Sequence, residues 1–149
     1  MKFIKSSGKK RIINELEQRF GITSLPYLLI KTGKEKIRGF SGSLSKDEIL
    51  QLVKLANIEI IGIYLMKEEL GMDLRLSFDA TQILQSQITK NIIEIDEKQF
   101  ADWIRGRDLD IEIQEGVYII KLKNDFIGCG VSNSKKIFNY VPKERRIRN

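Results

Sequence analysis

The sequence predicts an α+β protein, in which a small α/β N-terminal domain is followed by a domain of short antiparallel strands. Helix-like and strand-like hydrophobic patterns both occur in the first 87 residues. A strand-then-helix pattern restarts near residue 88, and turn-forming residue pairs then recur at short intervals. We therefore expect two domains, residues 1–87 and residues 88–149.

The N-terminal domain is expected to begin with a helix over residues 8–20. Its apolar residues recur at every fourth position, and Gly21 is a typical helix end. Residues 27–30 then form an extended apolar run. Residues 36–40 return as a second strand after a turn at residues 32–34.

A second helix is predicted by a capping box. Ser45 and Glu48 have the required spacing, so we expect a helix over residues 46–56. The next run, residues 58–66, is almost continuously apolar and is typical of a central strand. A turn, a short strand and a short helix over about residues 78–86 complete this domain. The buried stripe expected on the capped helix consists of Ile49, Leu52, Val53 and Ala56.

The C-terminal domain is expected to begin with a strand over residues 88–95. Asp96 and Gln99 resemble a second capping box, which starts a helix that reaches about Arg105 and ends at Gly106. The short strands that follow are expected at residues 109–113, 117–123, 126–131 and 137–140.

Composition excludes several classes of function. The 149 residues include one cysteine and no histidine, which excludes an internal disulfide, Ser-His-Asp and Cys-His catalysis, and His-ligated metal sites. No apolar run is long enough to span a membrane, and no signal peptide is visible. We therefore expect a cytoplasmic protein with no metal, no cofactor and no membrane partner. The single thiol, Cys129, is expected to be a buried core residue, as is Trp103.

Charge is distributed unevenly along the chain. The formal net charge is +6, from 26 Lys and Arg residues and 20 Asp and Glu residues. The whole excess lies within residues 121–149, whereas residues 1–120 are balanced. A basic segment of this kind indicates a polyanionic partner, most often nucleic acid, while the alternative is a solvated tail that only aids solubility.

Four motifs in the second half resemble one known family. Their residues stand as Phe100-Ala-Asp-Trp-Ile-Arg-Gly-Arg-Asp-Leu109, Gly116-Val-Tyr-Ile-Ile-Lys-Leu-Lys123, Ile127-Gly-Cys-Gly130, and Asn139-Tyr-Val-Pro-Lys143 with Arg145-Arg146. This order resembles the PUA-like domain that follows the catalytic domain of NOL/NOP/sun-type rRNA cytosine-C5 methyltransferases. The same domain occurs in stand-alone archaeal relatives labelled as ribosome-biogenesis proteins. The resemblance covers residues 88–149.

The resemblance implies a PUA-like pseudo-β-barrel that binds RNA without catalysis. The cysteines used by the related methyltransferases belong to a catalytic domain that this chain lacks, and no Gly-rich loop for S-adenosylmethionine is present. An acidic residue of the family pattern is replaced by Arg107 here, which makes that loop more basic. In PUA-like domains this loop and the neighbouring strand line the RNA cleft.

Nine residues are candidate RNA contacts, each with an ordinary structural alternative. The loop 105–107 is either a phosphate-contacting loop, where glycine lets the RNA backbone approach, or a plain helix cap. Tyr140 is either a base-stacking residue or a residue at the barrel rim. The remaining cations are either phosphate contacts or charges of a hairpin tip and a frayed terminus. The candidates are Arg105, Gly106, Arg107, Lys135, Lys136, Tyr140, Lys143, Arg145 and Arg146.

The function expected from these observations is non-catalytic RNA binding, to rRNA or tRNA, in ribosome biogenesis or RNA modification. Further expected partners are an RNA-modifying enzyme or pre-ribosomal proteins. The alternative is a protein-interaction adaptor, in which the N-terminal domain docks an RNA-modifying enzyme through residues 28–30 and 58–66. A small RNA-modifying enzyme is a third possibility, but no nucleophile or base for it can be identified.

Overall fold

In the computed structural model, which describes residues 1–148, the first helix follows the apolar spacing of its sequence. Helix α1 (Ser6–Phe20) buries Ile12, Leu16 and Phe20 completely. It ends at Gly21, whose φ of 83° places it in the left-handed region and whose N–H donates to the carbonyl of Glu17 at 3.0 Å. The predicted helix and its predicted end are therefore confirmed.

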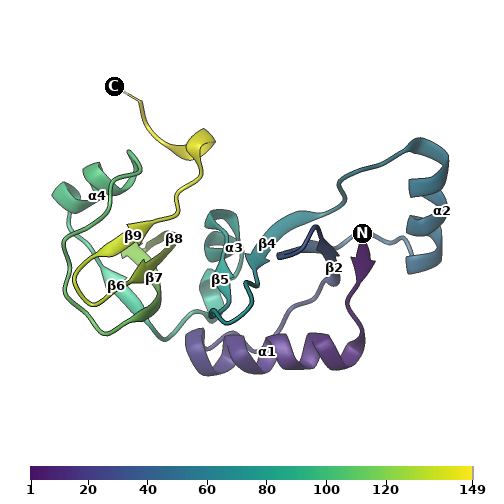
Figure 1. The fold of residues 1–149 in the computed structure, drawn as a ribbon, viewed down its shortest axis with the longest axis horizontal. Helices are drawn as coiled ribbons and strands as arrows, with labels where there is room; N and C mark the ends of the chain where they lie inside the picture. The colour runs from purple at the N-terminus through teal and green to yellow at the C-terminus, as the bar shows by residue number, and fades with distance from the viewer. Residues whose placement is uncertain (149) are drawn as a thin grey trace.

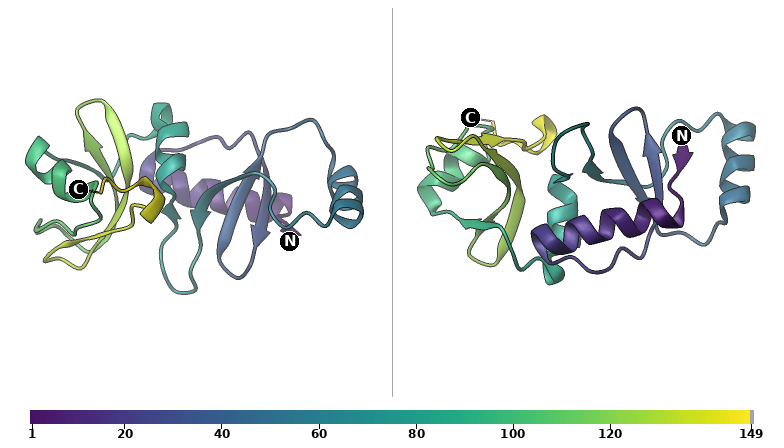
Figure 2. Two further views of the ribbon diagram at one scale, coloured as in Figure 1. Left: turned by 90° about the horizontal axis from the view of Figure 1, so that it is seen from above. Right: turned by 60° about the horizontal axis from the view of Figure 1, so that its bottom comes forward.

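Five strands form an antiparallel sheet in chain order, and α1 runs along this sheet (Figures 1 and 2). The predicted hairpin of residues 27–40 is present within it. The strands are β1 (Lys2–Phe3), β2 (Leu28–Thr32), β3 (Lys36–Phe40), β4 (Ile63–Lys67) and β5 (Arg75–Leu76).

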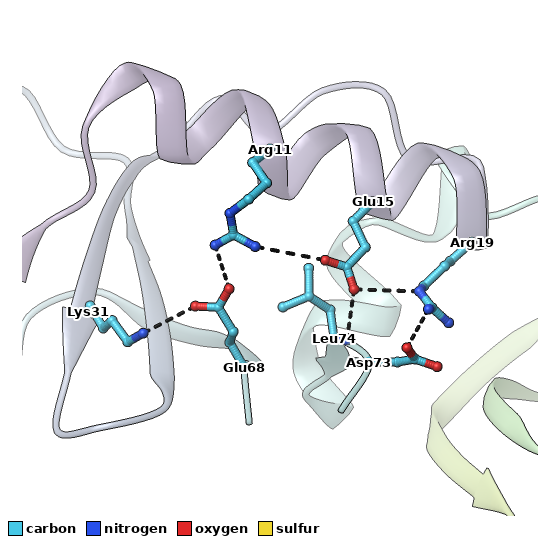
Figure 3. Close-up of polar contacts among 7 residues, drawn as sticks. All are labelled: Arg11, Glu15, Arg19, Lys31, Glu68, Asp73 and Leu74. Carbon is cyan, nitrogen blue, oxygen red and sulfur yellow. Dashed lines mark hydrogen bonds and ion pairs between the residues drawn. The ribbon is translucent and has the colours of Figure 1, made fainter. Parts of the chain in front are cut away.

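An ion-pair network ties α1 to the loop between β4 and β5 (Figure 3). Glu68 accepts from Arg11 at 2.5 Å and from Lys31 at 3.1 Å. Partial burial acts to raise the pKa of Glu68, but these two hydrogen bonds outweigh it and hold the pKa below its ordinary value. Glu15 accepts from the backbone N–H of Leu74 at 3.2 Å. The network fixes the segment that leads into β5.

A second, four-stranded sheet lies at the other end of the molecule (Figure 1). Residues 117–120 of this sheet are all apolar because alternate side chains pack in two different cores. Val117 and Ile119 pack in the core shared with α1, whereas Tyr118 and Ile120 pack in a second core on the opposite face. Both faces of the sheet are thus covered. The strands are β6 (Ile92–Glu94), β7 (Gly116–Leu122), β8 (Asp125–Ser132) and β9 (Ile137–Asn139), with β6 and β7 parallel.

Helix α3 (Phe78–Ile83) joins the two sheets. Ser77 caps it by accepting from the N–H of Ala80, and the Ser77 hydroxyl donates to the Tyr64 carbonyl on β4 at 2.6 Å. On the other side, Thr81 accepts from the N–H of Gly128 on β8 at 3.1 Å. A short 3-10 helix, η1 (Gln85–Gln87), completes the helical segment predicted at residues 78–86.

Helix α2 (Lys46–Ala56) has the predicted capping box but not the predicted buried stripe. Only Ile49 is buried, while Leu52 is 41% and Leu55 86% exposed. The helix lies at the end of the molecule far from the second sheet, so few elements can cover it (Figures 1 and 2). The expected strand over residues 58–66 is correct only from Ile63 onwards.

In the second half one further expectation is wrong and another is not confirmed. Residues 109–113 do not form a strand, because only Leu109 pairs, in a single bridge with Ile137. The second sheet of the described residues is open, so the expected pseudo-barrel is not confirmed. The domain division at residues 87 and 88 stays a prediction. Apolar side chains from both of these parts share one core.

Candidate nucleic-acid interface

The loop that carries three candidate residues is set by the end of helix α4 (Glu97–Trp103). Its predicted capping box is present, with Gln99 and Asp96 bonded in both directions. Trp103 is fully buried and donates from Nε1 to the carbonyl of Ile127 at 2.8 Å. Gly106 follows with a φ of 88°, and its N–H donates to the Trp103 carbonyl. Burial of the tryptophan thus fixes where the loop begins.

The two arginines of this loop flank the glycine. The Arg105 guanidinium donates to the carbonyl of Ala101, in the last turn of α4, at 2.9 Å. Arg107 is exposed and pairs with Asp102 at 2.9 Å. These contacts complement the negative end of the helix dipole. They also leave the Arg107 guanidinium at the surface.

Asn139 connects the loop to the last strand. Its side-chain NH₂ group donates to the carbonyls of Trp103 at 2.7 Å and Arg107 at 2.8 Å. Its side-chain oxygen accepts from the N–H of Val141, and its own N–H donates to Asp108. One amide therefore holds the loop and the final segment together. Sequence reasoning quoted Asn139 in a motif but did not select it as a site residue.

Arg146 lies over Gly106. A Cβ atom added at Gly106 would lie 2.5 Å from Arg146 Nε, so a larger residue at this position would have to displace the Arg146 side chain. Arg146 Nε also donates to the carbonyl of Val141, and the N–H of Ile147 donates to the carbonyl of Ile104. From the sequence we expect an RNA backbone to approach Gly106. In the structure the Arg146 side chain occupies that space. The RNA-contacting role of Gly106 stays a prediction.

Tyr140 faces a residue of the first sheet. The guanidinium of Arg75 lies 3.8 Å from the centre of the Tyr140 ring, an arrangement typical of a cation–π contact. Tyr140 nevertheless remains 41% exposed. Its ring is therefore held on one face and partly open to solvent. Sequence reasoning missed Arg75, because no local signal connects β5 with a residue 65 positions later in the chain.

The cations around η2 (Lys143–Arg145) differ in their partners. Arg145 pairs with Asp79 at the start of α3 at 2.8 Å. Lys143 is exposed, and no ion pair involves it within residues 1–148. Arg145 therefore anchors the C-terminal segment to α3, whereas the Lys143 ammonium stays at the surface without an ion pair among the described residues.

The remaining two candidates lie in the turn between β8 and β9. Asn133 accepts from the N–H groups of both Lys135 and Lys136. Lys136 pairs with Asp108 at 3.3 Å and lies over the ring of Phe138. Lys135 is exposed, and in the described part of the chain it makes no ion pair.

The structure brings the candidates together in two groups. Asn139 and Arg146 join the loop 105–107 to the final segment, and Asp108 brings Lys136 to the same place. Tyr140 and Arg145 instead face β5 and α3. The acidic partners of these cations are at the surface, where an ion pair contributes only about 0–1 kcal/mol. A phosphate can therefore replace a carboxylate at little cost.

Neither a cysteine nucleophile nor a metal site is supported by the described residues. Cys129 is buried, as predicted, and burial raises the pKa of its thiol to about 12. A thiol of this pKa is not a nucleophile at neutral pH. Within residues 1–148 no cluster of acidic or cysteine side chains has the arrangement of a metal site. None of the described helices has the length and apolar character needed to cross a bilayer.

Comparison with known families identifies the second half of this architecture. Residues 90–147 match the family described as the methyltransferase RsmF PUA domain, the PUA-like domain of rRNA C5-methyltransferases. No curated protein matches the chain. PUA domains bind RNA and are not themselves catalytic, so RNA is the partner implied for this region. The resemblance drawn from the four motifs is confirmed: residues 90–147 match the PUA domain of methyltransferase RsmF.

Proposed function

We propose that this protein is a non-catalytic RNA-binding protein that acts on rRNA or tRNA in ribosome biogenesis or RNA modification. The observation that carries this proposal is the PUA domain whose loop 105–107 and final segment are held together by Asn139 and Arg146. The tail cations at this junction belong to residues 121–149, which contain the entire excess positive charge of the chain. A modifying enzyme or pre-ribosomal proteins would act with it as further partners.

The mechanism that we propose is phosphate neutralisation followed by recognition of shape. Exposed cations such as Arg107, Lys135 and Lys143 contact phosphates and release counterions. The free face of Tyr140 stacks on an unpaired base, while Arg75 holds the ring from behind. Arg146 and Gly106 act by positioning the tail against the loop.

Binding to RNA is tested best with cations that make no structural contact. We expect Lys135→Glu combined with Lys143→Glu to lower affinity for a structured rRNA fragment by about tenfold or more. The slope of log K against log salt should become shallower by about 0.7–0.9 for each lost phosphate contact. The measurement is fluorescence anisotropy over a series of salt concentrations.

The matched control carries the same change of charge at exposed lysines of α1 and α2. Lys10→Glu combined with Lys54→Glu should keep most of the wild-type affinity and most of its salt slope. Equal losses in the two double variants would show that only net charge matters, and would contradict the proposed site. The charge reversal Arg146→Glu is a poorer test, because Arg146 packs against Gly106.

An adaptor that docks an RNA-modifying enzyme through its N-terminal domain is the second candidate function. Part of the expected docking surface is buried, namely Leu29, Ile30, Leu65 and Met66, whereas Ile60 is 66% exposed. Exposed leucines lie on α2 instead, and this observation favours the second candidate. An adaptor whose tail only aids solubility would retain wild-type RNA affinity in the Lys135→Glu and Lys143→Glu double variant.

A further inference from the structure

An open pocket lies between the first sheet and the C-terminal segment. Its volume is about 730 Å³, within the range of pockets that hold small ligands. Residues of β3, β4, α3 and η2 line it. The turn η2 lies beside α3 (Figures 1 and 2), to which Arg145 is joined by its ion pair with Asp79. The side chains that decide its chemistry are Lys36, Arg38, Tyr64, Asp79, Glu144 and Arg145.

The charge of this pocket favours an anion. Asp79 already pairs with Arg145 at 2.8 Å. Lys36 is exposed and makes no ion pair among residues 1–148. Arg38 is fixed by donating from Nε and Nη2 to the carbonyl of Gly62, at 3.1 and 2.9 Å. The lining carries the basic side chains of Lys36, Arg38 and Arg145 against the acidic ones of Asp79 and Glu144. One positive charge is therefore in excess, and Lys36 is the basic group of the lining that stands at the surface without a carboxylate partner among residues 1–148.

Tyr64 supplies an aromatic surface in the same pocket. Its ring is partly buried, and the ammonium of Lys36 lies 5.6 Å from the ring centre. Burial raises the pKa of the Tyr64 hydroxyl, so the ring stays neutral. An aromatic ring beside cations is the arrangement by which proteins bind unpaired nucleotides, through stacking and phosphate contacts together.

We propose that an unpaired stretch of RNA enters this pocket and is bound by Lys36 and Tyr64, so that the interface extends from the PUA domain onto the first sheet. This proposal rests on the proposed function. Paired bases do not expose their faces for stacking, whereas an unpaired base does. The N-terminal domain is thereby part of the RNA-binding surface.

The experiment compares two RNA probes, a blunt hairpin and the same hairpin with a single-stranded 3′ extension of uridines. We expect the wild-type protein to bind the extended hairpin about tenfold more tightly than the blunt one. Lys36→Glu combined with Tyr64→Leu should abolish this preference while leaving the affinity for the blunt hairpin unchanged. Lys36→Glu alone should reduce the preference, and its exposed position makes it safe for folding.

Lys34→Glu is the matched control, because Lys34 is exposed two residues away and does not line this pocket. It should retain the preference for the extended hairpin. Thiouridine placed in the extension should crosslink to the peptide that contains Tyr64. An equal affinity of the wild type for both probes, or an unchanged preference in Lys36→Glu with Tyr64→Leu, would overturn this inference alone. Absence of binding to either probe would overturn the proposed function as well.

Discussion

Helices α2 and α4 begin with the same signal and end in different surroundings. Each has a complete capping box, at Ser45 and Asp96 respectively. Helix α4 buries Trp103 completely and leads into the loop that carries Gly106. Helix α2 buries only Ile49 and leaves its leucines exposed. A capping box therefore determines where a helix starts, whereas tertiary neighbours determine what that helix contributes.

The two helices should differ most in the free energy of unfolding lost when a large side chain is removed, and Trp103 is the large buried side chain of α4. We expect Trp103→Ala to destabilise the protein by about 3–5 kcal/mol, because it removes a large core side chain and a buried hydrogen bond to Ile127. Leu55→Ala on α2 should change stability by less than about 0.5 kcal/mol, since Leu55 is 86% exposed. The measurement is urea unfolding followed by circular dichroism.

A milder variant keeps this comparison measurable if Trp103→Ala fails to fold. Trp103→Phe retains the aromatic ring but loses the donor, and should cost about 1–3 kcal/mol by leaving the buried carbonyl of Ile127 without its partner. Similar costs for Trp103→Phe and Leu55→Ala would show that α4 is no better integrated than α2.

The next effect concerns the glycine beneath Arg146. Gly106→Ala should lower the free energy of unfolding by about 1–2 kcal/mol because the φ of this residue is 88°. Displacing the Arg146 side chain should lower it further. Gly33→Ala isolates the first contribution, because its φ is 61° and no atom lies within 4 Å of the added Cβ. We expect Gly106→Ala to be the more destabilising in thermal unfolding. Equal costs would mean that Arg146 moves aside freely.

Local signals predicted most of the helices and strands, and the failures have a common cause. Capping boxes, helix-ending glycines and turn pairs act within a few residues, so they can be recognised in the sequence. Burial of the predicted α2 stripe beyond Ile49 and pairing of residues 109–113 depend on distant partners. In the second case only Leu109 finds a partner, at Ile137. The apolar character of both segments therefore misled the prediction.

The candidate site was likewise predictable from local motifs only, and not from contacts between residues far apart in the sequence. The motif around Asn139 marked the correct region, but its hydrogen bonds to Trp103 and Arg107 became visible only in three dimensions. Arg75 and Lys36 lie on the first sheet, far in sequence from the basic tail. No periodicity or spacing connects them to Tyr140 or Arg145, because that proximity is created by the packing of the two sheets through α3.

The smallest expected effect compares the two caps directly. Asp96→Ala should lower global stability by about 0.5–2 kcal/mol, since α4 is held in the core by Trp103. Ser45→Ala removes an equivalent cap, but its loss should be confined to α2 and shift the global unfolding midpoint by less than about 0.5 kcal/mol. Amide hydrogen exchange distinguishes the two, with faster exchange restricted to residues 46–56 in Ser45→Ala.

A titration of Glu48 provides an independent measure of the α2 cap. Hydrogen bonds from the backbone N–H of Ser45 and, to a smaller extent, from its hydroxyl hold the pKa of Glu48 below its ordinary value. A lowered pKa in the folded state stabilises the helix start at pH values above 4.5, and this contribution is lost as the pH falls through the folded pKa. NMR should therefore show the Glu48 midpoint moving up towards its ordinary value in Ser45→Ala. An unchanged midpoint would show that the Ser45 hydroxyl does not contribute to the lowered pKa of Glu48, and that the backbone N–H of Ser45 accounts for it.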